Sequence, residues 1–321
     1  MMASDFKSLL GTAQEIAREK HSTPPAVIKE LLHYEILQAL IQSGSASSLV
    51  FQGGTALRLC YGGIRYSEDL DFVGGPMFDP TTIKPFMDQL KDNVAATYGL
   101  EVKIDEHLPN KEDNVPIGRW KSKIFLPQYD KSVKQNYVIH LEVAQVRSYT
   151  HELRPIRVIS NNLAYGYRSL LVRVESKEEI LADKIIALGG REYLKSRDLW
   201  DIYMLAQDNV HLNIEFVRHK IDDYHLGHAA FVTKLQERAN LLAQMSTVDA
   251  FQKEMPRFLD TNLQAMIHDP QVVRQILDIG IVVAHDAINH LKPELLLDRS
   301  QIVDEDLEQP PPDPPRMGFR I

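Results

Sequence analysis

One short block between residues 49 and 73 constrains the fold more than any other part of the sequence. An apolar run typical of a buried strand leads into the pair Gly53-Gly54, a helix follows, and a second apolar strand closes the block. Asp69 and Asp71 stand one residue apart at this second strand. Because alternate residues of a strand share a face, both carboxylates are expected to project toward the mouth that the glycines form.

The glycine turn has the composition of a phosphate site. Glycine lets the backbone approach a phosphate closely, and the amides at a helix start favour anions. Thr55 adds a hydroxyl donor directly after the glycine pair. Two carboxylates such as Asp69 and Asp71 supply oxygen ligands for Mg²⁺, which takes further ligands from nucleotide phosphates. The combination predicts a site for a divalent metal and a triphosphate, whereas a tight turn with two solvent-facing acids is the structural alternative.

A third carboxylate is expected from a neighbouring strand, because two metals need a bridging set of oxygens. Glu142 lies in the alternating apolar run Ile139-His140-Leu141-Glu142-Val143-Ala144, where a buried acid is otherwise costly. We therefore assign Asp69, Asp71 and Glu142 as the metal ligands. His140 shares the face of Glu142, but an ordinary strand histidine is the simpler interpretation of that residue.

A second charged cluster surrounds Lys184, which falls on the apolar face of its predicted helix. An ammonium group is poorly placed there unless an anion meets it, and a β- or γ-phosphate is a natural partner. Asp198 and Asp201 lie three residues apart on one side of the next helix, close in sequence to Arg191 and Arg197. We expect Asp198 to cap that helix and to orient Lys184 or Arg191. A structural salt-bridge network between the two helices is the alternative.

Composition excludes several other kinds of protein. The chain has 321 residues, of which 44% are hydrophobic and 25% charged, so it is long enough to bury a sizeable core. Its single cysteine, Cys60, rules out an internal disulfide and a cysteine metal cluster and fits a reducing setting. The sequence shows neither a secretory pattern nor an apolar run of membrane-spanning length, so we expect a soluble cytoplasmic protein.

The net charge is −8, but basic residues outnumber acidic ones between residues 111 and 198. A local basic surface there would face an anionic partner, and a solvated face with scattered charges is an equal alternative. The basic side chains concerned are Arg119, Lys121, Lys123, Lys131, Lys134, Arg147, Arg154 and Arg157.

The order of predicted elements indicates an α+β fold with two lobes. Two helices precede the glycine block, and an amphipathic helix and three or four strands follow it. From Ser176, which opens a capping box, the pattern is helical up to about residue 297. The expected domains are 1–175, a catalytic domain with N-terminal helices; 176–300, a helical domain carrying the lysine and aspartate motifs; and 301–321, a flexible proline-rich tail.

Three segments together resemble a known family. They are Phe51-Gln52-Gly53-Gly54-Thr55-Ala56-Leu57, then Arg65-Tyr66-Ser67-Glu68-Asp69-Leu70-Asp71-Phe72, then Ala182-Asp183-Lys184 with Arg197-Asp198-Leu199-Trp200-Asp201-Ile202. In order and approximate spacing they resemble the AbiEii/AbiGii-type nucleotidyltransferases of the DNA polymerase β-like superfamily. This family includes the MenT-like toxins of type IV and related toxin–antitoxin systems. The resemblance covers residues from about 50 to 205.

The resemblance implies a bilobal, polymerase β-like mixed sheet flanked by helices, with transfer of a nucleoside monophosphate from an NTP in the presence of Mg²⁺ or Mn²⁺. Some MenT-like members modify the 3′ end of tRNA, so tRNA is the expected acceptor and a cognate antitoxin is an expected partner. The catalytic residues carried over are Asp69, Asp71, Lys184 and Asp198. The nucleotide-binding residues carried over are Gly54, Thr55 and Lys184, and we predict Gly53, Ser67 and Arg191 as further nucleotide-binding residues.

Two other functional classes stay open from the sequence. A catalytically silent protein of the same fold binds nucleotide or an antitoxin without releasing pyrophosphate, and within the enzyme class a protein is an alternative acceptor. A metal-dependent phosphohydrolase or phosphotransferase with an aspartyl nucleophile also uses Asp-x-Asp after a strand. In that class a threonine soon follows the pair, whereas here Phe72-Val73-Gly74 follows and a glycine turn precedes.

Overall fold

A computed structural model describes residues 2–108, 117–125, 136–160, 163, 167 and 169–296. The predicted loop at 109–116, the basic residues Lys131 and Lys134 and the proline-rich tail lie outside these described residues. In the described part of the chain, no helix combines the length and apolar content that a membrane crossing requires.

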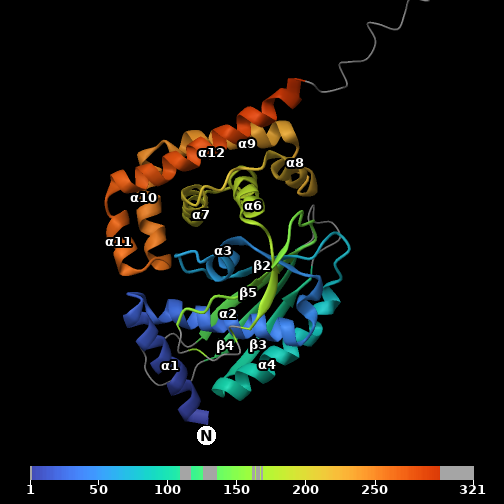
Figure 1. The fold of residues 1–321 in the computed structure, drawn as a ribbon, viewed down its shortest axis with the longest axis vertical. Coiled ribbons are helices and arrows are strands. Elements are labelled where there is room, and N and C mark those ends of the chain that lie inside the picture. Colours follow the sequence, from blue (N-terminus) through green and yellow to red (C-terminus); the bar gives the residue numbers. More distant parts are fainter. Residues whose placement is uncertain are drawn as a thin grey trace, which may run out of the picture.

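Helices make up most of the chain's regular structure (Figure 1). They are α1 (Met2–Glu19), α2 (Pro24–Gln42), α3 (Gly53–Tyr61), α4 (Lys84–Tyr98), α6 (Lys177–Gly190), α7 (Ser196–Gln207), α8 (Ile214–Asp223), α9 (His228–Leu242), α10 (Met245–Glu254), α11 (Thr261–Ile267) and α12 (Pro270–Leu296). Short 3₁₀ turns are η1 (Ser45–Ser48), η2 (Pro80–Ile83) and η3 (Met255–Phe258).

Seven strands within the described residues form one mixed sheet in the order β3-β4-β5-β2-β1-β7-β6. They are β1 (Val50–Gln52), β2 (Leu70–Val73), β3 (Glu101–His107), β4 (Ile117–Phe125), β5 (Asn136–Ala144), β6 (Glu152–Pro155) and β7 (Leu171–Val174). Strand β2 is central, because it pairs antiparallel with β1 on one side and parallel with β5 on the other. The strand that carries Asp71 is therefore held on both edges.

The helices cover the two faces of the sheet differently (Figure 1). Helices α1, α2 and α4 lie against one face, and α6 and α7 lie on the other. Helices α8 to α12 pack outside α6 and α7, so the C-terminal half forms a second, helical lobe. This arrangement confirms the predicted α+β class with a helical C-terminal lobe.

Local signals explain where several elements begin and end. Half of the predicted capping box forms, because the hydroxyl of Ser176 accepts a hydrogen bond from the Glu179 amide at the start of α6, whereas the Ser176 amide donates to Thr150 and not to Glu179. Helix α3 begins at Gly53 itself, so the glycine pair that was expected to precede the helix forms its first two residues. Strand β6 was not predicted, since Glu152–Pro155 is charged, ends in proline and shows no apolar alternation. It forms only an edge strand on β7.

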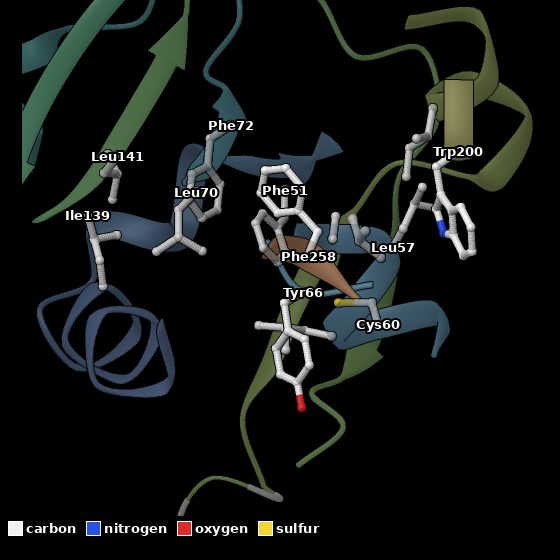
Figure 2. Packing of buried hydrophobic residues seen from close by; sticks show 14 of the residues in the cluster. Phe51, Leu57, Cys60, Tyr66, Leu70, Phe72, Ile139, Leu141, Trp200 and Phe258 are labelled. Carbon is white, nitrogen blue, oxygen red and sulfur yellow. The ribbon is translucent and has the colours of Figure 1, made fainter. Parts of the chain in front are cut away.

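A single large hydrophobic cluster runs through both lobes. Phe51 of β1 and Phe72 of β2 stack with ring centroids 4.8 Å apart (Figure 2). Phe258 of η3 and Trp200 of α7 belong to the same cluster, although both come from the C-terminal half. The helical lobe is thus packed directly on the sheet lobe, and the division into domains at residue 175 stays a prediction.

The C-terminal helices also return to the first lobe through the backbone. The amide of Tyr66 donates to the carbonyl of Phe258 at 2.7 Å, and the amide of Thr261 donates to the carbonyl of His21 at 2.8 Å. The lobes are therefore joined at the connection from β7 to α6 and again around η3.

The predicted basic surface does not form one patch. Lys121 and Lys123 lie on β4, whereas Arg154 lies on β6, with four strands between them in the sheet. At the usual strand spacing this separation is roughly 24 Å. Lys123 and Arg154 also form local ion pairs, with Asp105 and Glu152. Among the residues that the structure describes, scattered surface charges therefore fit better than a single basic patch.

Candidate active site

Two neighbouring strands bring the predicted acids together. Asp71 of β2 stands opposite Glu142 of β5 in the parallel register, and Leu70 stands opposite Leu141. Asp69 comes directly before β2, and its Oδ1 lies 3.1 Å from Nδ1 of His140. The pairing of β2 with β5 therefore places two acid-bearing positions side by side, and the expected third carboxylate does come from a neighbouring strand.

The glycine pair has two separate structural reasons. Gly53 has φ near +77°, a left-handed conformation that side chains rarely adopt, and a Cβ there would lie 2.8 Å from Oδ2 of Asp71. A Cβ on Gly54 would overlap the guanidinium of Arg65. One glycine thus makes room for the central carboxylate, and the other makes room for a buried arginine that pairs with Asp201.

A cleft of about 560 Å³ opens between the sheet and α6. Gly53, Asp71 and Glu142 line its sheet side, and Lys184 and Arg191 line its helix side. The volume is typical of a site for a nucleotide-sized ligand. The other lining residues are Gln52, Phe72, Ile117, Arg119, Ala144, Asp183, Ile186, Ala187, Gly190, Tyr193, Lys195, Tyr224 and Leu226.

The surroundings of Asp71 disfavour the charged form of its side chain. Burial, then the nearby charges of Glu142 and Asp69, raise the pKa of Asp71 to about 6. Lys184 and Arg197 act in the opposite direction but do not cancel this effect. A cation placed between Asp71 and Glu142 relieves the repulsion, so the donor set fits a divalent metal.

The acids form an open site rather than a closed cage. In the described chain, no three His, Cys, Asp or Glu side chains converge as a ready metal-binding group. Glu142 Oε1 instead accepts a hydrogen bond from Arg119 Nε at 2.9 Å, and Asp69 faces His140. Such an arrangement suits Mg²⁺, which is bound by one or two carboxylates together with substrate phosphates.

Lys184 lies in a buried ionic network between α6 and α7. Its Nζ lies 2.8 Å from Oδ1 of Asp198 and 2.8 Å from Oδ2 of Asp201. Asp201 also receives two hydrogen bonds of 2.6 Å from Arg65, and Asp198 pairs with Arg191. Three cations therefore share two carboxylates, and the positive side of the network faces the cleft through Lys184 and Arg191.

The same network tunes the titration of its members. Burial by itself raises the pKa of Asp198, but Lys184 and Arg191 outweigh it and hold that pKa well below its usual range. The pKa of Asp201 is lowered in the same way by Arg65 and Lys184. Burial lowers the pKa of Lys184, yet the two aspartates raise it above its ordinary value. All three groups are charged at neutral pH.

Three predicted contacts differ in the structure. The Thr55 side chain is buried and its hydroxyl donates to the backbone oxygen of Asp69, so it supports the acid loop instead of facing the cleft. Ser67 is half-buried and is absent from the residues that line the cleft. Asp198 does not cap α7, because the helix begins at Ser196 and Lys195 is the capping position. The Thr55 contact depends on tertiary pairing, which local spacing cannot show.

A second buried network links α6 to α8. Lys220 Nζ is 2.7 Å from Oδ1 of Asp183, 3.0 Å from Oε1 of Glu179 and 3.5 Å from Oε1 of Glu175. Burial and then Asp183 raise the pKa of Glu175 well above its ordinary value. The pKa of Glu179 is lowered despite burial, because Lys220 and the amides and hydroxyl around Thr150 stabilise its charge.

The comparison with protein families now decides the assignment. The model described as nucleotidyl transferase AbiEii toxin of a type IV toxin–antitoxin system matches residues 35–279, more than half of the chain. The chain belongs to the AbiEii family. It is therefore a nucleotidyltransferase, and the match spans the glycine turn, the acids and the Lys184 network of this AbiEii chain.

Two solved structures from Helicobacter pylori are also similar to the AbiEii chain. JHP933 is 21% identical and matches 87% of this chain and 99% of its own, with a TM-score of 0.43. A protein described as a candidate nucleotidyltransferase is 21% identical and matches 85% of this chain and 98% of its own, with a TM-score of 0.44. No curated protein matches the chain.

Several cleft residues of the AbiEii chain were missed in the sequence. Lys195 lines the cleft, and its pKa is lowered by burial and by Arg191 and Arg197. Arg119 pairs with Glu142 across the β4–β5 ladder. The alternation of β4 pairs Arg119 with Glu142 once the strand register is known, whereas the loop position of Lys195 gave no periodic signal.

Proposed function

We propose that this AbiEii chain transfers a nucleoside monophosphate from an NTP to the 3′ end of tRNA in a Mg²⁺-dependent step, and that a cognate antitoxin restrains it. The observation that carries the chemistry is the desolvated Asp71, set beside Glu142 and opposite the cationic wall of one cleft. The tRNA acceptor follows from the resemblance to MenT-like toxins. The metal ligands remain Asp69, Asp71 and Glu142.

The two sides of the cleft divide the work in this proposal. Helix α3 begins at Gly53, which lines the cleft, so its first backbone amides and its positive N-terminal end favour the phosphates of a bound NTP. Arg191 and Lys195 offset the negative charge that develops on the departing pyrophosphate. Lys184, held by Asp198 and Asp201, supplies a fixed positive charge. When bound, the divalent metal polarises the α-phosphate and aligns the attacking hydroxyl.

The domain division gives each lobe a role. Residues 1–175 contribute the acids and the glycine turn, and residues 176–300 contribute the cations of α6 and the loop after it. Substrate phosphates therefore bridge the lobes, and positioning supplies most of the catalysis.

The test is a labelling reaction with the purified full chain. Wild type, Asp71→Asn and the exposed-site control Asp88→Asn are each incubated with tRNA, Mg²⁺ and one α-³²P-labelled NTP at a time. Wild type and the control should label tRNA with a preferred nucleotide, and Asp71→Asn should lose label at least about 100-fold, in keeping with loss of a main transition-state stabiliser.

Thermal unfolding of the same samples checks the fold. Asp71→Asn should unfold at or above the wild-type temperature, because the variant no longer buries a repelled carboxylate. Full labelling by a folded Asp71→Asn variant would contradict the catalytic assignment. Label on protein instead of tRNA would show that the acceptor is a protein. NTP binding without any pyrophosphate release would indicate a catalytically silent binding protein.

A further inference from the structure

One aromatic side chain in the cleft is unusually exposed. Of the Phe, Tyr and Trp side chains that the structure describes, Tyr193 alone is exposed, at 63%. It lies in the loop between α6 and α7 and lines the cleft that holds Asp71. An aromatic ring left in water at the mouth of a polar cleft has apolar surface available for a ligand.

The backbone that carries Tyr193 is held in place from a third helix. Lys234 of α9 donates to the carbonyl of Gly190 at 2.9 Å. Arg238, one turn further along α9, donates to the carbonyls of Arg191 at 2.8 Å and Glu192 at 2.6 Å. Three successive carbonyls are thus fixed by two cationic side chains, whose hydrogen bonds are stronger than neutral ones. The exposed ring projects from an anchored loop.

The neighbours of the ring match the chemistry of a nucleotide. Arg191 and Lys195 flank Tyr193 in the sequence, and both line the same cleft. The ammonium of Lys195 lies 5.8 Å from the centroid of the Tyr193 ring. An exposed aromatic ring in a cleft that cations also line is a combination that binds nucleic acid components, with the cations on phosphates and the ring against a base.

We propose that Tyr193 is a stacking surface for a nucleobase, and that Lys234 and Arg238 are positioning residues that hold its loop. The inference rests on the proposed function and adds a base-recognition residue to it. The base belongs either to the incoming NTP or to the acceptor strand, and the two sources share the same flat π-surface.

Binding measurements separate the base from the phosphates. Calorimetric titrations use wild type, Tyr193→Ala, Tyr193→Phe and Met245→Ala, with α,β-methylene NTPs, inorganic tripolyphosphate and tRNA as separate probes in Mg²⁺ buffer. Met245 is a matched control because it is 61% exposed but lies at the start of α10, outside the cleft lining. Tyr193→Ala should lower the affinity for one base-bearing probe about tenfold, since stacking is worth roughly 1–3 kcal/mol per base.

The pattern of losses identifies the source of the base. A loss for the methylene NTPs places the base on the nucleotide, and a loss for tRNA alone places it on the acceptor. Tripolyphosphate affinity should stay unchanged, and Tyr193→Phe and Met245→Ala should behave as wild type. Equal losses for tripolyphosphate and the NTPs, or unchanged affinity for every probe, would overturn the proposal.

The anchoring role of Arg238 has its own readout. Arg238→Ala should weaken the binding of the same base-bearing probe in the wild-type background. In the Tyr193→Ala background it should cause no further loss of affinity, because both changes remove the same ring–base contact. Additive losses would assign Arg238 a separate role and contradict its positioning function. Because these titrations need no turnover, base stacking by a protein that never labels tRNA would count against the proposed acceptor reaction alone.

Discussion

Asp183 and Lys184 are neighbours in α6, yet they belong to opposite kinds of buried ionic network. Lys184 joins Asp198 and Asp201 with two arginines, so cations exceed carboxylates. Asp183 joins Glu175, Glu179 and Lys220, so carboxylates exceed the single cation. Successive residues of a helix point about 100° apart, which lets one turn of α6 serve both networks.

The difference teaches how each network resolves its excess charge. The Lys184 network opens onto the cleft, where its surplus positive charge remains available to an anionic substrate. In the Lys220 network, Glu175 and Glu179 are fully buried, and burial together with the charge of Asp183 raises the pKa of Glu175 well above its ordinary value. One network presents its excess positive charge to the cleft, whereas in the other network burial and mutual repulsion disfavour the charged form of one acid.

The largest expected effect comes from removing the only cation of the acidic network among the described residues. Lys220→Met should lower the free energy of unfolding by roughly 3–5 kcal/mol, because three carboxylates lose their common partner in a buried place. Urea denaturation followed by circular dichroism measures it. Lys91→Met, which breaks the exposed pair with Asp88, is the control and should change stability by less than about 1 kcal/mol. Equal losses of stability for Lys220→Met and Lys91→Met would show that the buried network is worth no more than an exposed ion pair.

An aspartate-to-asparagine change should have different consequences in the two networks. Asp201→Asn leaves Arg65 buried without its bidentate partner and should destabilise the fold by about 3 kcal/mol. Asp183→Asn removes one of three competing carboxylates and should change stability by less than about 1 kcal/mol. The two variants are compared in parallel urea titrations. A larger loss for Asp183→Asn than for Asp201→Asn would contradict the assigned charge balance.

The smallest expected effect is a difference in pH dependence. Because the pKa of Glu175 is raised on folding, its stabilising contribution is complete below about pH 4.5 and is lost as pH rises through the folded value. The stability of Glu175→Gln relative to wild type should therefore grow by about 1 kcal/mol over the first pH unit above that point. Unfolding titrations between pH 4 and pH 8 measure the difference. A constant difference would show that Glu175 ionises normally.

Asp198 provides the opposite sign as a comparison. Its pKa is lowered on folding, so its contribution is present above about pH 3.8 and is lost as pH falls through the folded value. Asp198→Asn should be less stable than wild type at neutral pH, and this deficit should shrink as the pH falls below that point. Glu175→Gln and Asp198→Asn are therefore expected to change stability with pH in different ranges, above about pH 4.5 and below about pH 3.8.

The local part of this protein was predictable from its sequence. The strand, glycine turn, helix and strand between residues 50 and 73 follow from apolar periodicity and the glycine pair. Glu142 was selected because an acid in an alternating apolar strand is costly without a partner, and only the strand register shows that it stands opposite Asp71. Lys184, Asp198 and Asp201 were grouped correctly from helical spacing. The catalytic and metal-binding roles of these residues stay predictions.

Long-range partners explain what was not predictable. Arg65 meets Asp201 across 136 positions of sequence, so no local pattern revealed why Gly54 is small. The same limit hid the direction of the Thr55 hydroxyl, which serves the Asp69 backbone. Lys184 was expected to meet a phosphate because it is a lysine on an apolar face, whereas two aspartates already hold it. Local periodicity shows which face a residue occupies but not its partner.

The return of η3 to the first lobe has a mechanical consequence. The lobes meet at the β7–α6 connection and again where Tyr66 bonds Phe258 and Thr261 bonds His21. The second attachment is made of hydrogen bonds only, so a rotation that separates the lobes at η3 would have to break both of them. A rotation about an axis that passes through both attachments would leave these bonds in place and would still change the width of the cleft.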